Sequence, residues 1–113
     1  MSKNFESDCI FCQIANHELN GEIVNENEQF VAFRDIKPVS QGHTLVIPKQ
    51  HIDDFDQLAQ QEPTLIQDYL AFVNQTKNQL MNQYRPKGVK ISFNTGKLIE
   101  VRHLHAHLIP VYD

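Results

Sequence analysis

Three histidines lie close to the end of the chain and alternate with apolar or small residues, in the order His103-Leu104-His105-Ala106-His107. Successive side chains of an extended strand point to opposite faces, so this spacing predicts that all three imidazoles share one face. Imidazole titrates near neutral pH, which suits it to proton transfer, nucleophilic attack or metal ligation. The row therefore predicts chemistry, because the alternative of a merely polar outer face gives no reason for strict alternation of one residue type.

One metal ion does not easily account for the whole row. The outer two imidazoles would lie about 13 Å apart at the usual strand rise, whereas zinc holds its nitrogen ligands at about 2.0 Å in a tetrahedron. A strand that bound one ion through all three would need a sharp distortion. Separate roles for the three histidines are the simpler hypothesis, and a metal-dependent hydrolase with catalytic zinc on this row is an alternative.

The composition indicates one soluble globular domain. The chain has 113 residues, of which 41% are hydrophobic and 21% are charged, and this is enough for a single core. No apolar run approaches the roughly 20 residues that cross a bilayer. The formal net charge of −4 argues against electrostatic capture of long DNA or RNA, although a small nucleotide could still bind in a local pocket.

The first residues give an expectation about location. Residues 1–8 are polar, with order expected only near Phe5, and they lack the apolar core of a signal peptide. We therefore expect a cytoplasmic protein.

Two cysteines, Cys9 and Cys12, follow with the spacing C-x-x-C. In a cytosolic chain such a pair fits a redox couple, half of a zinc site or two unrelated thiols. A redox couple of the thioredoxin type would follow a buried strand, and no apolar strand precedes Cys9. The zinc hypothesis needs two more ligands, which the spare histidines could supply.

The elements that must position these side chains follow from hydrophobic periodicity. Apolar residues recur at spacings of three and four between Pro63 and Tyr84, which predicts one long helix with proline in its first turn. Residues 53–61 read as a polar connector. The pattern favours an α+β domain in which an antiparallel sheet of about five strands carries the long helix and a short N-terminal helix. The short helix is expected at 9–17, and strands are expected at 23–24, 30–33, 43–48, 89–93 and 103–110, with a hairpin turn at 25–28.

Several separate blocks of the sequence resemble the histidine-triad (HIT) family. The row of histidines matches the motif that gives the family its name. Four other blocks fall in the order and near the spacing that the family shows, namely residues 9–14, 32–38, 42–51 and 94–96. The resemblance covers almost the whole chain and implies a single HIT domain over residues 1–113, with a purine nucleotide or a related nucleotidyl compound as substrate.

The resemblance also implies roles in catalysis. In that family the triad binds the α-phosphate and its middle histidine attacks phosphorus, which assigns the nucleophile to His105. His107 would donate a hydrogen bond to phosphate oxygens, His43 resembles the histidine that steadies the triad, and Asn94 opens the block before it. The chemistry agrees, since a neutral imidazole is a competent nucleophile and its phosphoramidate adduct can be hydrolysed.

Other residues resemble the nucleotide-binding positions of the family. Asp35 matches the acid that accepts hydrogen bonds from the ribose hydroxyls, for which an ionised carboxylate is suited. Turn chemistry before Pro38 is the alternative explanation of this aspartate. Six apolar residues match positions that sandwich the base, and each could equally belong to the core: Ile10, Phe11, Ile14, Leu19, Phe33 and Ile36.

A structural zinc ion is implied in the same way. Some bacterial members of the family bind zinc through the paired cysteines, a histidine after Pro-Lys-x and the first triad histidine. These correspond here to Cys9, Cys12, His51 and His103. A closed shell of two thiolates and two imidazoles leaves no open position, so such an ion would be structural.

One residue departs from the family pattern. Ile99 stands in the loop where many members carry a polar residue, and an isoleucine cannot donate a hydrogen bond to the leaving group. Lys97 and Arg102 are the nearby cations that could approach phosphate instead. The expectation is a hydrolase or transferase that cleaves a nucleoside phosphoramidate or dinucleoside polyphosphate through a nucleotidyl-histidine. The alternative is a nucleotide-binding module with little turnover.

The resemblance finally implies a homodimer. Relatives pair through the long helix and the strand at 89–94, which would make one continuous sheet across the two-fold axis.

Overall fold

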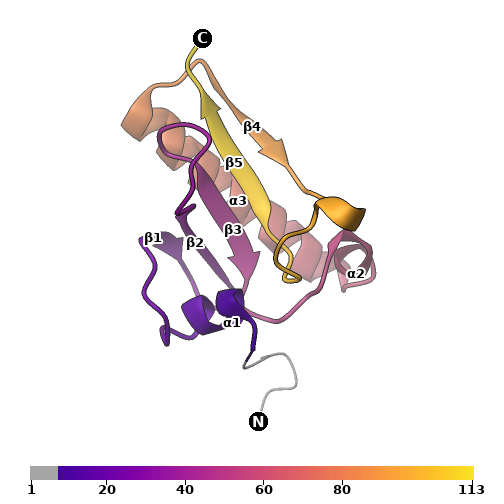
Figure 1. Ribbon diagram of the computed structural model, residues 1–113. Helices are drawn as coiled ribbons and strands as arrows, with labels where there is room; N and C mark the ends of the chain where they lie inside the picture. Colours follow the sequence, from indigo (N-terminus) through magenta and orange to yellow (C-terminus); the bar gives the residue numbers. More distant parts are fainter. Residues whose placement is uncertain (1–7) are drawn as a thin grey trace.

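A computed structural model describes residues 8–113, so the order expected near Phe5 lies outside the described residues. Figure 1 shows one antiparallel sheet with α3 behind it and α1 in front. The sheet has five strands in the order β1-β2-β3-β5-β4, which confirms the predicted α+β class. The strands are β1 (Ile23–Glu26), β2 (Phe30–Arg34), β3 (Thr44–Pro48), β4 (Gly88–Ser92) and β5 (Ala106–Val111).

The long helix α3 spans Pro63–Tyr84, the range predicted from the sequence. Pro63 stands in the first turn, where its missing N–H costs no helical hydrogen bond. The helix ends at Arg85, which adopts a left-handed conformation (φ 53°). The Arg85 N–H donates to the Met81 carbonyl oxygen at 3.1 Å. Among the described residues, no helix is long and apolar enough to span a membrane.

Two shorter helices complete the fold. The N-terminal helix α1 (Ile10–Ala15) is shorter than expected, because Cys9 is its N-cap rather than its first residue. Helix α2 (Phe55–Ala59) lies within residues 53–61, so the prediction of a simple polar connector there was wrong. The Asp54 carboxylate caps α2 by accepting the Gln57 N–H at 3.0 Å. The sequence carries no periodic apolar pattern for this helix, because Leu58 is its only buried side chain.

The hairpin between β1 and β2 is tighter than predicted. Strand β1 continues to Glu26, so the turn is confined to the residues after it rather than beginning at Asn25. The Asn27 side chain closes this turn by accepting the N–H groups of Gln29 and Phe30 at 2.8 and 2.9 Å. The residue type that suggested a turn is therefore the one that forms it.

The sheet separates two apolar layers. The larger core lies between α3 and one face of the sheet, and the smaller lies between α1 and the other face. Alternation along β2 divides its residues between them, since side chains of a strand point to opposite faces in turn. Phe30 and Ala32 belong to the larger core, whereas Val31 and Phe33 belong to the smaller. The histidine segment therefore leads into a sheet that is covered by α3 on one face and by α1 on the other.

The apolar face of the histidine row is as predicted, but the strand is shorter. Leu104, Ala106 and Leu108 all lie in the larger core. Strand β5 begins only at Ala106, so the prediction of one strand from His103 was wrong for its first residues. The Leu104 N–H donates to the carbonyl oxygen of Ile52 at 2.7 Å, which ties the chain to the loop after β3. His103 nevertheless stays on the same side as His105, since the Phe11 ring packs against both imidazoles.

Candidate active site and metal centre

His105 has one ring nitrogen fixed by the backbone. Its Nδ1 lies 2.7 Å from the His103 carbonyl oxygen. A carbonyl can only accept, so Nδ1 carries the proton of the neutral ring and Nε2 keeps its lone pair. The ring centroid of His107 lies 5.0 Å away. The arrangement presents a neutral, oriented imidazole, which is the form that can act as a nucleophile.

His107 is oriented by a chain of hydrogen bonds that begins at a backbone amide. The Val39 N–H donates to His43 Nδ1 at 3.1 Å, so the proton of neutral His43 must lie on Nε2. That Nε2 lies 3.0 Å from His107 Nδ1 and donates to it. His107 therefore carries its own proton on Nε2. The amide nitrogen of Asn94 lies 3.4 Å from this Nε2, but it is itself a donor and does not accept the proton. The outcome is a donor N–H beside the free lone pair of His105.

Asp35 uses its two carboxylate oxygens differently. Oδ1 accepts the Lys37 N–H at 2.9 Å, which is the turn chemistry that the sequence offered as an alternative. Oδ2 lies 3.5 Å from His43 Nε2. Asp35, His43 and His107 lie close enough to hold a metal ion. An ion on His43 Nε2 would drive the proton onto Nδ1, against the Val39 N–H, so a proton chain suits this cluster better.

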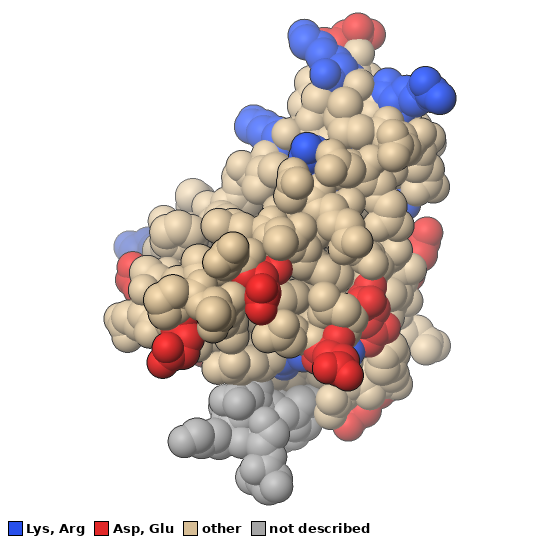
Figure 2. All heavy atoms as spheres, turned by 180° about the vertical axis from the view of Figure 1, so that it is seen from behind, with Lys and Arg blue, Asp and Glu red and all other residues tan. Residues whose placement is uncertain are grey.

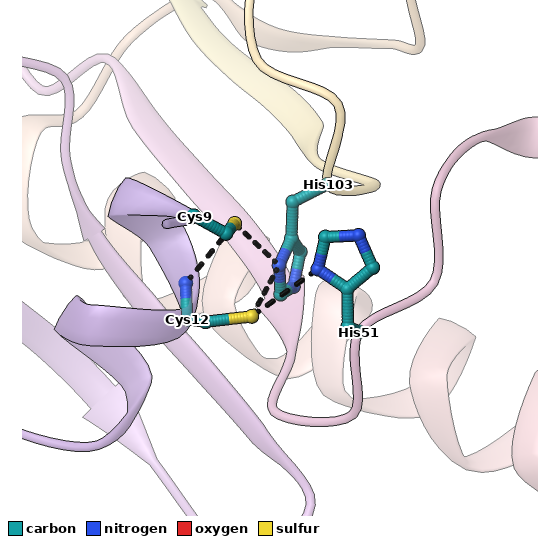
Figure 3. Close-up of side chains that lie close together, drawn as sticks. All are labelled: Cys9, Cys12, His51 and His103. Carbon is teal, nitrogen blue, oxygen red and sulfur yellow. Dashed lines mark hydrogen bonds between the residues drawn. The ribbon is translucent and has the colours of Figure 1, made fainter. Parts of the chain in front are cut away.

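A second cluster lies at the start of the histidine segment. Figure 3 shows Cys9, the N-cap of α1, and Cys12 of α1 facing His103 and His51. The Nδ1 of His103 lies 3.3 Å from Cys9 Sγ and 3.4 Å from Cys12 Sγ. The Nδ1 of His51 lies 3.2 Å from Cys12 Sγ. All four ligand atoms fall within 4.8 Å of one another.

The donor set fits a tetrahedral zinc ion. Zinc bonds of about 2.3 Å to sulfur and 2.0 Å to nitrogen place neighbouring ligand atoms about 3.5 Å apart, close to the separations above. The other nitrogen of each imidazole is already engaged. His103 Nε2 donates to the Pro48 carbonyl oxygen at 2.7 Å, and His51 Nε2 to Asp53 Oδ1 at 2.8 Å. Both Nδ1 lone pairs consequently point at the cysteine sulfurs, as metal-binding histidines require.

Comparison with known proteins decides the family. Residues 8–112 match the family model described as "Scavenger mRNA decapping enzyme C-term binding". A HIT-like protein of Mycoplasma genitalium, MG132, is 37% identical over 115 residues, covering 100% of this chain and 79% of the relative.

The chain belongs to the histidine-triad (HIT) family.

Two further relatives bear on the two clusters. Adenosine 5'-monophosphoramidase HINT3 of Mus musculus is 33% identical over 110 residues, which cover 96% of this chain and 66% of that protein. The crystal structure of a zinc-bound histidine triad family protein from Mycobacterium smegmatis superposes with a TM-score of 0.82 at 30% identity. That match covers 93% of this chain and 76% of the other. The predicted HIT fold is thereby confirmed.

Burial favours the neutral forms of three histidines of this HIT domain, His43, His103 and His107. Desolvation lowers the pKa values of His43 and His107, and the nearby Asp35 carboxylate opposes this only in part. Repulsion from His105 lowers the pKa of His107 further. Burial lowers the pKa of His103 to about 4, although its hydrogen bond to Pro48 acts in the opposite direction. The hydrogen-bond chain and the ligand set both need the neutral forms that these shifts favour at pH 7.

These shifts predict that the metal-free protein loses stability in mild acid. The pKa of His103 is about 4 in the folded chain, against a usual value of 6.5, so the unfolded chain binds more protons on acidification. The free energy of unfolding should fall by about 2 kcal/mol from pH 7 to pH 5 from this group alone, and level off below pH 4. Urea titrations at each pH in the presence of a chelator measure it. Asn82→Ala, at an exposed position of α3 without a titratable side chain, should keep the same slope, and a flat profile for the wild type contradicts the prediction.

The predicted base-contacting residues divide into two groups. Three are buried under the site, with exposed fractions of 7%, 7% and 4% for Phe11, Ile14 and Phe33. Three are exposed, at 50% for Ile10, 41% for Leu19 and 92% for Ile36. The Phe11 ring packs edge-on against His105 at a centroid distance of 5.1 Å. The buried three thus shape the site as core residues, which was the alternative reading of each of them, and the exposed three are free to meet a ligand.

The loop before the triad brings a further set of residues to His105. A small hollow beside His105 is lined in part by Asn94, Ile99 and Asp54. Arg102 donates to Asp54 Oδ2 at 3.1 Å, so it is held at the cap of α2 rather than aimed at the triad. Ile99, in contrast to Arg102, lines the hollow beside His105, where its position in the loop had predicted it.

Two functional contacts escaped the sequence analysis. Asp53 accepts a hydrogen bond from His51 Nε2. The sequence feature that could have indicated this contact is a carboxylate two residues after a candidate metal ligand. Val39 orients His43 through its backbone amide, for which no side-chain pattern gives a signal.

Proposed function

We propose that this HIT protein hydrolyses a nucleotidyl bond at the α-phosphate, with an adenosine phosphoramidate or a related purine nucleotide as substrate. The observation that carries the proposal is the opposed protonation of the two neighbouring imidazoles. His105 offers a lone pair on Nε2, whereas His107 offers a proton on Nε2. A nucleophile beside a hydrogen-bond donor is what displacement at phosphorus requires. The name of the HINT3 relative, a monophosphoramidase, supports the choice of substrate class.

The reaction would proceed in two displacements. The lone pair of His105 Nε2 attacks phosphorus, the bond from phosphorus to nitrogen breaks, and the amine departs with a proton taken from solvent. Water then attacks the same phosphorus and gives a proton to solvent, the bond to His105 breaks with its electron pair returning to Nε2, and a nucleoside monophosphate is released. His107 donates to the phosphate oxygens in both steps. Asp35 Oδ2 accepts from the ribose hydroxyls, and the exposed Ile10, Leu19 and Ile36 contact the base.

Trapping the intermediate tests this function. Wild-type protein is mixed with adenosine 5'-phosphoramidate, quenched in alkali within the first turnover and digested for mass spectrometry. We expect a nucleotidyl adduct on the peptide that contains His105, together with release of AMP. A hydrolase with catalytic zinc on the triad would activate water directly and leave no adduct, so turnover without an adduct supports that alternative.

The second candidate function is nucleotide binding with little turnover. The observation that favours it is Ile99, which lines the hollow beside His105 and cannot donate a hydrogen bond to a leaving group. AMP binding by calorimetry, together with no release of AMP from the phosphoramidate, supports this module. The same measurements on wild type therefore separate the two functions.

The four-ligand cluster is proposed to hold a structural zinc ion. Cys9→Ser should remove the metal and lower the melting temperature by several degrees, because zinc binding contributes free energy to the folded state alone. Elemental analysis of protein purified without chelator measures the metal, and calorimetry measures the melting temperature. Asn16→Ser, just after α1, is the control and should retain both. Wild-type protein without zinc, in which both thiols react freely, contradicts the proposal. The cytoplasmic location expected from the sequence would keep these thiols reduced.

Dimerisation is proposed through β4 and α3. Strand β4 is an edge of the sheet, and its Ile91 side chain is 46% exposed. Figure 2 shows the molecule from behind, with Lys and Arg gathered at the upper end, Asp and Glu toward the lower end, and a largely uncharged middle region. An open edge strand invites pairing with a second chain. Light scattering at micromolar concentration should give a molar mass of two chains for the wild type. Ile91→Lys should lower this mass toward that of a single chain. A monomer mass for the wild type contradicts the prediction, and Lys90→Arg serves as control.

A further inference from the structure

His103 belongs to both clusters at once. Its Nδ1 faces the sulfurs of Cys9 and Cys12, at 3.3 and 3.4 Å. Its backbone carbonyl oxygen is the acceptor that fixes the proton on His105 Nδ1, at 2.7 Å. His103 is fully buried, and its other ring nitrogen is held by the Pro48 carbonyl. One residue therefore connects the metal ligands to the group that orients the nucleophile.

Helix α1 provides a second connection between the two clusters. Phe11 lies between the two cysteines in sequence, and its ring meets His105 edge-on at 5.1 Å and 86°. The same ring packs edge-on against Phe33 at 5.3 Å. The helix has only six residues, which is too short to be stable without tertiary contacts. Its position against the sheet, and with it the position of Phe11, depends both on its packing in the smaller core and on what holds Cys9 and Cys12.

We propose that the cluster of Cys9, Cys12, His51 and His103 positions the nucleophile, and does not only stabilise the fold. An ion bound there would hold the His103 peptide and helix α1 together. Both contacts that fix the His105 ring, the carbonyl of His103 and the edge of Phe11, then stay in place. The inference rests on the proposed function in taking His105 as the nucleophile. Cys9, Cys12 and His51 act through His103 and Phe11, so they are positioning residues.

The consequence of losing the ion follows from the two tautomers of a neutral imidazole. Only the form with its proton on Nδ1 presents the Nε2 lone pair to a substrate. The His103 carbonyl selects this form, and Phe11 limits rotation of the ring. When both contacts loosen, the other tautomer and other ring orientations become populated, and a misplaced nucleophile reacts more slowly by about tenfold or more.

The experiment compares the imidazole of His105 in three metal states. Protein labelled with ¹⁵N in histidine is examined by NMR as zinc-loaded wild type, as chelated wild type and as His51→Ala. We expect one tautomer, with the proton on Nδ1, in the first sample and a mixture in the other two. The rate of AMP release from adenosine 5'-phosphoramidate should fall by about tenfold in parallel. Phe11→Leu keeps all four ligands and the metal, and should show an intermediate loss of tautomer preference.

Leu80→Ala is the matched control for a general loss of stability. Leu80 is fully buried in the core on the α3 side, across the sheet from α1. Its truncation lowers stability through a cavity and should leave the His105 tautomer and the metal content unchanged. A single tautomer of His105 in both metal-free samples overturns the inference, as does an equal change in Leu80→Ala. A metal-dependent tautomer in a protein without turnover would instead contradict the proposed function, while it would still support the inference that the cluster fixes the His105 ring.

Discussion

His105→Asn should lower kcat for adenosine phosphoramidate by at least about 10⁴-fold, the size of loss seen when an enzyme loses its nucleophile. The amide of asparagine fills part of the space of the imidazole but has no comparable nucleophilicity. Its side-chain nitrogen can still donate to the His103 carbonyl that His105 now meets at 2.7 Å. The variant should therefore keep the shape of the site and lose only the attacking lone pair.

The measurement pairs turnover with binding. The dissociation constant for AMP, from calorimetry, should change by less than about tenfold, because Asp35, the proposed ribose acceptor, is untouched. The nucleotidyl adduct should be absent after a rapid quench. His17→Asn is the matched control, since it makes the same change at an exposed histidine that pairs with Glu26 far from the triad in sequence. Hydrolysis by His105→Asn at the wild-type rate means that another group attacks phosphorus.

The sequence predicted which side chains come together better than how each is held. Strict alternation identified the apolar face of Leu104, Ala106 and Leu108, all of which lie in the α3 core. The three imidazoles keep to the predicted side, since the Phe11 ring packs against both His103 and His105, but alternation did not predict that regular strand begins only at Ala106. The cause is the hydrogen bond from the Leu104 N–H to the Ile52 carbonyl. A contact with a loop far away in sequence bends the chain before β5, and no local period contains that information.

The candidate metal ligands could be predicted from the sequence, whereas the proton chain could not. Cys9, Cys12, His51 and His103 are recognisable by residue type and family spacing, and the structure brings all four together. The amide of Val39, by contrast, decides the tautomers of His43 and His107. Every residue has a backbone amide, so its use at one position depends on the path of the loop. Side-chain chemistry can be predicted from sequence, but the choice of tautomer needs the fold.

His107→Phe should lower kcat by about 100-fold, which corresponds to about 3 kcal/mol of lost transition-state stabilisation at an oxyanion-type site. Phenylalanine keeps a ring of similar width, but it removes the N–H that the chain from Val39 through His43 turns toward the phosphate. His43 would keep Asp35 Oδ2, 3.5 Å away, as a partner for its Nε2 proton. The fold should therefore tolerate the change.

The kinetic pattern identifies the role of His107. The hydrogen bond to phosphate strengthens as charge shifts during displacement, so kcat and kcat/KM should fall by the same factor while KM stays near its wild-type value. His43→Asn is the graded comparison. Its amide oxygen can accept the Val39 N–H, but its amide nitrogen, on a shorter side chain, does not reach the position of His43 Nε2. His107 then keeps its own proton and loses only its fixed tautomer. The loss in kcat should then stay below about tenfold. If kcat falls equally in His107→Phe and His43→Asn, the essential proton is on His43. If kcat is unchanged in His107→Phe, His107 takes no part in the reaction.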